Sequence, residues 1–201
     1  ERLPPMPTAR AGCAAAVAAG KIYVCGGLVM AWQVLDVVES LDPEARKWRR
    51  LPPMPTPRCG CSAVGIGGRV LVIGGQLADG TVLDKVEALS LDSQTWETLT
   101  PMPSGRSGCS SFMAAGLLHI VGGLGSTGLT MPVVDRLDPE NLEWKQPLAL
   151  NVDRAGCAAG VASNMIYVVG GFDSFRRDCD RSEMLDANSK ELLQLPPLQI
   201  A

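Results

Sequence analysis

Histidine is almost absent from this sequence: its 201 residues include one, His119, and aromatic residues make up 4% of the chain. A histidine zinc site needs several imidazoles, and a catalytic triad needs partners that orient the ring. The seven cysteines include no CxxC pair, and no apolar run reaches the roughly 18 residues that a membrane-spanning helix needs. These absences exclude most familiar enzyme chemistries, a histidine-based zinc site and a transmembrane helix.

Positive charge is not in excess either, since 18 Lys and Arg residues face 21 Asp and Glu residues, for a formal net charge of -3. Nucleic-acid binding relies on a positive surface that neutralises phosphates, so we expect no nucleic acid partner. Residues 1–7 (ERLPPMP) lack the apolar core of a signal peptide, and the odd number of cysteines indicates reduced thiols. We therefore expect a cytoplasmic protein with no membrane partner and no cofactor.

Glycine and proline, by contrast, are abundant, with 22 and 15 residues, and Gly-Gly pairs return every 48 residues. Arginines, cysteines and acids repeat at the same interval. The series are Gly26-Gly27, Gly74-Gly75, Gly122-Gly123 and Gly170-Gly171; Arg10, Arg58, Arg106 and Arg154; Cys13, Cys61, Cys109 and Cys157; and Glu39, Glu87, Asp135 and Glu183. A fixed period of this length is typical of propellers and other repeat architectures. The sequence predicts one repeat domain over residues 1–201, with units near 8–55, 56–103, 104–151 and 152–201 after a short tail, residues 1–7.

Each repeat predicts four short antiparallel strands and no helix. In the first repeat they fall near residues 12–18, 21–27, 35–42 and 47–55. The first of these segments (GCAAAVA) consists of small residues, as expected where equivalent strands converge on an axis. The predicted class is therefore all-β, with four 48-residue repeats.

Residues 37–75 carry the pattern through which this chain resembles the kelch-repeat β-propellers. Glu39 is followed by an Asp-Pro turn, then by Trp48, a Met-Pro pair, Arg58 and a strand that ends in Gly-Gly. Residues 54–62 (MPTPRCGCS) are most similar to the small kelch-domain-containing members of the family. Since closed kelch rings usually have six or seven blades, the resemblance implies that four repeats are a segment of a larger ring, whose open edges could self-associate. The fourth repeat departs from the pattern, because it lacks the Trp and the Met-Pro.

The repeated arginines have two interpretations. They could form a basic rim that binds an acidic partner, or they could pair with the repeated acids as structural supports. In kelch proteins that read peptide degrons, this Arg, the residue after it and residues just past the Gly-Gly pair line the pocket. The resemblance therefore implies these partner-binding residues: Arg10, Arg58, Arg106, Arg154, Ser107, Gln76, Asp173 and Arg176.

Trp32 lies outside the repeat, in the variable segment 28–33, close to Met30. An exposed aromatic residue of this kind can anchor a partner, although the segment could also fold onto its own blade. Trp48, Trp96 and Trp144 obey the repeat, and we expect them to be buried between blades. His119 occupies a repeat position held elsewhere by Tyr or Leu, so we expect it to serve in packing.

These features predict a non-catalytic module that binds a peptide or a partner protein, acidic if the arginine rim is real, on one propeller face. The resemblance implies a possible role as the substrate-recognition part of a ubiquitin-ligase adaptor. Two alternatives stay open: a propeller enzyme that processes acidic sugars, and a purely structural scaffold. No catalytic residue and no metal ligand is assigned.

Overall fold

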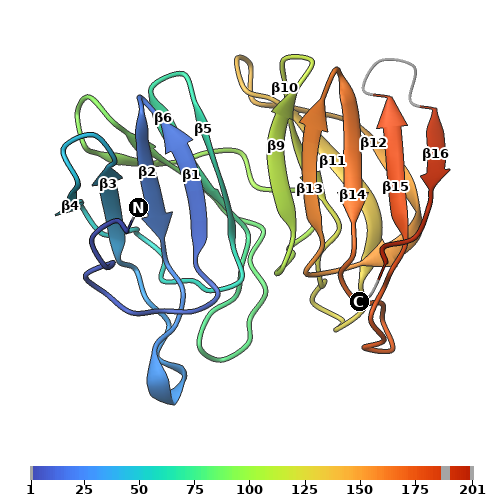
Figure 1. The fold of residues 1–201 in the computed structure, drawn as a ribbon, viewed down its shortest axis with the longest axis horizontal. Coiled ribbons are helices and arrows are strands. Elements are labelled where there is room, and N and C mark those ends of the chain that lie inside the picture. Colours follow the sequence, from blue (N-terminus) through green and yellow to red (C-terminus); the bar gives the residue numbers. More distant parts are fainter. Residues whose placement is uncertain (1, 187–190, 200–201) are drawn as a thin grey trace. The chain divides into compact units, whose positions relative to one another are not determined.

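Four separate antiparallel sheets, each of four strands, make up the computed structural model (Figure 1). The structure describes residues 2–186 and 191–199. Each sheet corresponds to one repeat and is called a blade, numbered in chain order. Within every blade the strands pair in sequence order, first to second to third to fourth. The predicted all-β architecture of four propeller blades is confirmed.

The strand bounds follow the predicted segments, except that the last strand of the third blade continues past residue 151, the predicted end of that repeat, to Arg154. Blade 1 contains β1 (Ala14–Ala18), β2 (Lys21–Cys25), β3 (Val38–Asp42) and β4 (Lys47–Arg50). Blade 2 contains β5 (Ser62–Ile66), β6 (Arg69–Ile73), β7 (Val86–Ser90) and β8 (Trp96–Thr98). Blade 3 contains β9 (Ser110–Ala114), β10 (Leu117–Val121), β11 (Met131–Asp138) and β12 (Glu143–Arg154). Blade 4 contains β13 (Ala158–Ala162), β14 (Met165–Val169), β15 (Ser182–Asp186) and β16 (Leu192–Leu195).

The blades form two compact units, Glu1–Pro101 with blades 1 and 2, and Met102–Ala201 with blades 3 and 4. In the first unit, Cys25 and Val38 of blade 1 belong to one apolar core with Val70 and Val72 of blade 2. In the second unit, buried residues of blades 3 and 4 form a corresponding core. The expectation of a larger ring of six or seven blades stays a prediction.

Small residues in the first strands allow close approach of neighbouring blades. At Gly65 of β5, an added Cβ would lie 2.1 Å from the carbonyl oxygen of Val17 in β1. A real side chain cannot occupy that space without moving the backbone of the next blade. The composition of these strands is thus a packing requirement within the first unit.

The repeated tryptophans are less buried than expected. Trp48, Trp96 and Trp144 are half-buried, because each lies on the fourth strand of its blade, at the edge of the sheet. The indole N–H groups of Trp48 and Trp96 donate hydrogen bonds to the carbonyl oxygens of Pro4 and Pro52, both at 3.0 Å. In these two repeats, therefore, the Trp fixes the proline-rich segment that precedes each blade.

A short 3-10 turn, Met30–Trp32, interrupts the strands of blade 1. Across the residues that the structure describes, no helix has the length and apolar character to cross a membrane.

Candidate interaction surface

The four repeated arginines are buried, and each forms an ion pair with the acid of its own repeat. The Nη2 to carboxylate oxygen distances are 2.7 Å for Arg10–Glu39, 2.6 Å for Arg58–Glu87 and 2.6 Å for Arg154–Glu183, and Arg106 pairs with Asp135 in the same way. Each Nη1 also donates to the carbonyl oxygen of the first glycine of the Gly-Gly pair, at 3.0 to 3.2 Å. One side chain thus connects the start of the blade to its second and third strands.

Of the two predicted interpretations, this arrangement is the structural pairing and not the basic rim. All four arginine side chains are fully buried, so their guanidinium groups offer no charge to a partner. Burial lowers the pKa of Arg58, and the charge of Glu87 opposes that shift. Burial likewise raises the pKa of Asp135, against the effect of Arg106. A buried charge is tolerated only when it is paired, and each of these arginines is paired with an acid, so the repeated arginines are structural supports of the blades.

The residue after each Gly-Gly pair forms two isolated β-bridges. One bridge pairs it with the residue after the Arg, and the other pairs it with the residue six positions further along the chain. The bridged sets are Ala11, Leu28 and Val34; Cys59, Gln76 and Val82; Ser107, Leu124 and Thr130; and Ala155, Phe172 and Asp178. The second glycine of the pair lies close to this bridge: a Cβ at Gly27, which has φ 100°, would lie 2.7 Å from the carbonyl oxygen of Ala11. The Gly-Gly repeat is therefore a steric requirement of the bridge.

Each bridge closes a five-residue loop at the same end of its blade. We call these segments loop 1 (residues 29–33), loop 2 (77–81), loop 3 (125–129) and loop 4 (173–177). In every loop the N–H of the first residue donates to the carbonyl oxygen of the last, over 2.9 to 3.1 Å. The four loops share this closing bond although their sequences differ, so they present different side chains on similar supports.

The fourth position of every loop has a left-handed backbone. Loops 2 and 3 place glycine there, Gly80 at φ 85° and Gly128 at φ 80°. Loop 1 places Trp32 there at φ 61°, and loop 4 places Arg176 at φ 61°. A residue with a Cβ adopts this conformation at a cost of roughly 1 kcal/mol. Loops 1 and 4 thus carry large side chains at a position that favours glycine.

Loop 1 exposes two apolar side chains, Met30 at 93% and Trp32 at 77%. With Ala9, Ala11 and Leu28 they line an open, largely apolar cleft of about 530 Å³. Arg10 also contributes to the lining, but its guanidinium is bound to Glu39. The predicted exposure of Trp32 is confirmed.

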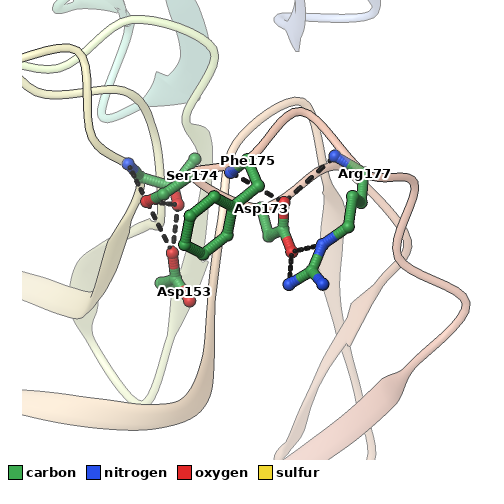
Figure 2. Close-up of polar contacts among 6 residues, drawn as sticks. Asp153, Asp173, Ser174, Phe175 and Arg177 are labelled. Carbon is green, nitrogen blue, oxygen red and sulfur yellow. Dashed lines mark hydrogen bonds and ion pairs between the residues drawn. The ribbon is translucent and has the colours of Figure 1, made fainter.

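Loop 4 is fixed by the carboxylate of Asp173, as Figure 2 shows. Its Oδ1 accepts hydrogen bonds from the backbone N–H groups of Phe175, at 2.9 Å, and Arg177, at 3.0 Å. The Arg177 side chain donates from Nε to Oδ2 at 2.8 Å, and this bond is the main reason why the pKa of Asp173 is lowered. Asp173, which the resemblance assigned to partner binding, uses its carboxylate inside the loop.

Loop 4 also connects to blade 3 through a hydroxyl network (Figure 2). The Ser174 hydroxyl donates to Asp153 Oδ2 at 2.8 Å and accepts a hydrogen bond from the backbone N–H of Thr130 at 3.0 Å. Hydrogen bonds from Thr130 and Ser174 lower the pKa of Asp153. Loop 4 is thus attached to the neighbouring blade as well as to its own.

Phe175 is the exposed aromatic residue of loop 4, with 78% of its surface accessible. The guanidinium of Arg177 lies 5.0 Å from the centroid of its ring, and Arg176 lies over Phe172 at the same distance. Phe175 was not among the residues predicted from the sequence to bind a partner. Its signal was available, because Phe175 lies in a variable loop outside the repeat, as Trp32 does.

Two further predicted residues take part in the bridges. Ser107 is buried, and its backbone donates to and accepts from Leu124, at 2.9 and 2.7 Å. Gln76 is half-buried and pairs in the same way with Cys59. Of the predicted partner-binding residues, Trp32 and Arg176 are the exposed ones.

Four-stranded antiparallel blades, each held by a buried Arg–acid pair beneath a Gly-Gly bridge, define a repeat propeller of the kelch type. The chain matches the family model described as the KLHDC2/KLHL20/DRC7 Kelch-repeats domain over residues 12–199, and it belongs to the kelch-repeat family. No curated protein matches the sequence. The narrower similarity of residues 54–62 to the small kelch-domain-containing members of the family, of the kelch domain-containing protein 8 type, stays a prediction.

The fold is also similar to that of a solved structure, described as "Structure of YjhT". The match has a TM-score of 0.86 and 19% sequence identity, and it covers 98% of this chain and 68% of that one. At this level of identity the likeness concerns the fold.

Proposed function

We propose that this chain is a non-catalytic protein-interaction module that binds a peptide or partner protein with its blade loops, and with loop 1 above all. One observation carries the proposal: Trp32 and Met30 are exposed beside an apolar cleft, and Trp32 occupies a backbone position that disfavours it. Non-glycine residues in left-handed conformations occur preferentially at functional sites. Exposed aromatic residues beside a pocket are frequent binding hot spots.

The chemistry of loop 1 favours an uncharged, apolar segment of the partner. None of its residues, Val29 to Gln33, is ionisable, and the one charged residue of the cleft, Arg10, is bound to Glu39. A charged partner group would lose water in this cleft without gaining an ion pair. An acidic partner, which the arginine rim suggested, is therefore not favoured at loop 1.

The rival functions fit less well. An enzyme for acidic sugars would need guanidinium groups that reach its substrate, and the four repeated arginines bind acids of their own repeats. A pure scaffold would have no reason to place Trp32 where loops 2 and 3 place glycine. The seven cysteines are thiols and not disulfides, which fits the reducing environment of the cytoplasm. Peptide capture is also the task of the substrate-recognition part of a ubiquitin-ligase adaptor, and we include that role in the proposal.

A phage-displayed library of random peptides, selected on the purified chain, tests the proposal. We expect enriched peptides with apolar residues, whose affinity falls about 30-fold for Trp32→Gly, the loss that a 2 kcal/mol hot spot gives. Leu193→Ala is the matched control, because Leu193 is an exposed apolar residue on β16, outside the loops. Failure to enrich any peptide, or equal affinity for Trp32→Gly, would contradict the proposal.

A further inference from the structure

His119 is fully buried on the face of blade 3 that packs against blade 4. It lies opposite Phe112 in the β9–β10 register, and the two rings stack with centroids 5.5 Å apart. Side chains two residues apart on a strand share a face, so Val121 lies on the same side. Phe112 and Val121 belong to one apolar core with Ile166 and Val168 of blade 4. His119 is thus a polar residue in an apolar inter-blade interface.

The hydrogen bonds of His119 define its neutral form. Nδ1 lies 3.1 Å from the carbonyl oxygen of Leu117, which can only accept, so Nδ1 carries the proton. Nε2 is buried and has no partner among the described residues. A second proton, which would bind at Nε2, would therefore meet no hydrogen-bond acceptor.

The charges around His119 would oppose that proton. On β11, Arg136 lies opposite His119 in the register, and its Nε and Nη2 donate to the carbonyl oxygen of Gln146. Lys145 of β12 comes next in the row and is bound by Glu143 and Asp138. The other acid of β11, Asp135, binds Arg106.

Blade 4 offers this interface mainly apolar side chains. Those of Ile166, Val168 and Leu185 pack here, and strands β13 and β16 contain no ionisable residue. The acids of β15 are Glu183, which binds Arg154, and Asp186, at the last position of the strand. A protonated His119 would thus be a second cation beside Arg136.

We propose that His119 makes the packing of blade 4 against blade 3 sensitive to acid, because a proton on Nε2 places an unpaired cation in this interface. The device is confined to blade 3, since the equivalent residues are Tyr23, Leu71 and Tyr167. Blade 4 carries loop 4, which is held to blade 3 through Thr130 and Ser174. Acid therefore loosens the support of loop 4 while loop 1, in the other unit, keeps its own.

The direction of the effect follows from the pKa of His119. Burial lowers this pKa below its usual value of 6.5; the hydrogen bond with the Leu117 carbonyl opposes that shift, and the charge of Arg136 adds to it. The unfolded chain therefore binds the proton at a higher pH than the folded chain does. The part of the free energy of unfolding that depends on neutral His119 is fully present above pH 6.5. It decreases as the pH falls from there toward the pKa of the folded state.

Wild type, His119→Leu and His119→Tyr form the test, since Leu and Tyr are the residues at this position in the other blades. In urea unfolding of the full chain between pH 8 and 5, we expect the wild-type unfolding constant to rise by up to tenfold per pH unit below 6.5. Both variants should lack this component. Hydrogen exchange, corrected for intrinsic rates, should locate the acid effect at β13 and β14 and not at β1 and β5.

A second measurement needs no variant. His119 is the chain's one histidine, so its ring resonances identify themselves in an NMR titration of the wild type. We expect a midpoint below 6.5, and a midpoint at or above 6.5 would overturn the proposal. So would variants that keep the wild-type pH dependence, or acid-induced exchange that is equal in both units.

Discussion

Loops 1 and 4 differ from loops 2 and 3 in the residue that they place at a shared left-handed turn, and loop 1 has a second left-handed residue, Ala31, at φ 65°. All four close with one hydrogen bond and turn at a left-handed fourth position. Loops 2 and 3 use glycine at that turn, whereas loops 1 and 4 use Trp32 and Arg176 and expose Met30 and Phe175 nearby. The comparison separates supporting residues from exposed ones: the arginines, acids and glycine pairs that repeat every 48 residues hold the blade together, whereas the non-repeating loop residues Trp32 and Phe175 are exposed.

The largest expected effect concerns a repeated position, Arg58. Arg58→Ala leaves Glu87 buried without its ion-pair partner and should lower the free energy of unfolding by about 3 to 5 kcal/mol. Arg69→Ala is the matched control, because the Arg69–Glu97 pair has the same 2.6 Å distance but is exposed, and should cost about 1 kcal/mol or less. Urea unfolding measures both. Loss of peptide binding in Arg58→Ala without loss of stability would show that Arg58 belongs to the recognition surface.

The next effect compares two glycines near loop 2. Gly75→Ala should cost roughly 2 to 4 kcal/mol, because Gly75 has φ 93° and an added Cβ would lie 2.7 Å from the Cys59 carbonyl oxygen. Gly80→Ala should cost about 1 kcal/mol, because Gly80 has a similar φ but open space around its Cα. Thermal unfolding of the two variants measures the difference. Equal losses would mean that the bridge does not require the glycine pair.

A smaller effect of opposite sign is expected at Trp32. Trp32→Gly removes the left-handed strain at position 32 and leaves that of Ala31, so the free energy of unfolding should rise by up to about 1 kcal/mol, less the entropy that glycine gains in the unfolded chain. Calorimetry detects this change as a higher melting temperature. A melting temperature several degrees lower would mean that Trp32 packs onto its own blade.

The last comparison separates a repeated tryptophan from Trp32. Trp96→Phe removes the hydrogen bond to Pro52 and should cost about 1 kcal/mol. Trp32→Phe should leave stability unchanged, since Trp32 is exposed. Urea unfolding of both variants provides the measurement, and a larger loss for Trp32→Phe would reverse the assignment of the two rings.

Much of the fold was predictable from the sequence because the residues that each blade needs for packing recur in successive repeats. The Gly-Gly pairs, the small first strands and the Asp-Pro turn specify the blade locally, and the strands lie where the pattern indicated. The pairing of Arg58 with Glu87 was one of two predicted arrangements. Choosing between them required knowledge of burial, which depends on the third dimension and not on the period.

The exposed surface was less predictable, for a physical reason. Trp32 was identified because it lies outside the repeat, but Phe175 lies outside it too and was missed. No spacing rule indicates that Asp173 closes loop 4 or that Nε2 of His119 lacks a partner, because both depend on how side chains meet within the second unit. Trp96 is half-buried because it lies on the edge strand of its blade. The repeat pattern identified that strand but did not indicate how exposed its side chains are.

A loop exchange tests the central claim most directly. Because loops 1 and 2 close in the same way, residues 29–33 (VMAWQ) can be replaced by the loop 2 sequence LADGT, and binding of a selected peptide measured by calorimetry. We predict a chain at least as stable as the wild type that no longer binds the peptide. Unchanged affinity in the exchanged chain would contradict the claim that recognition resides in loop 1.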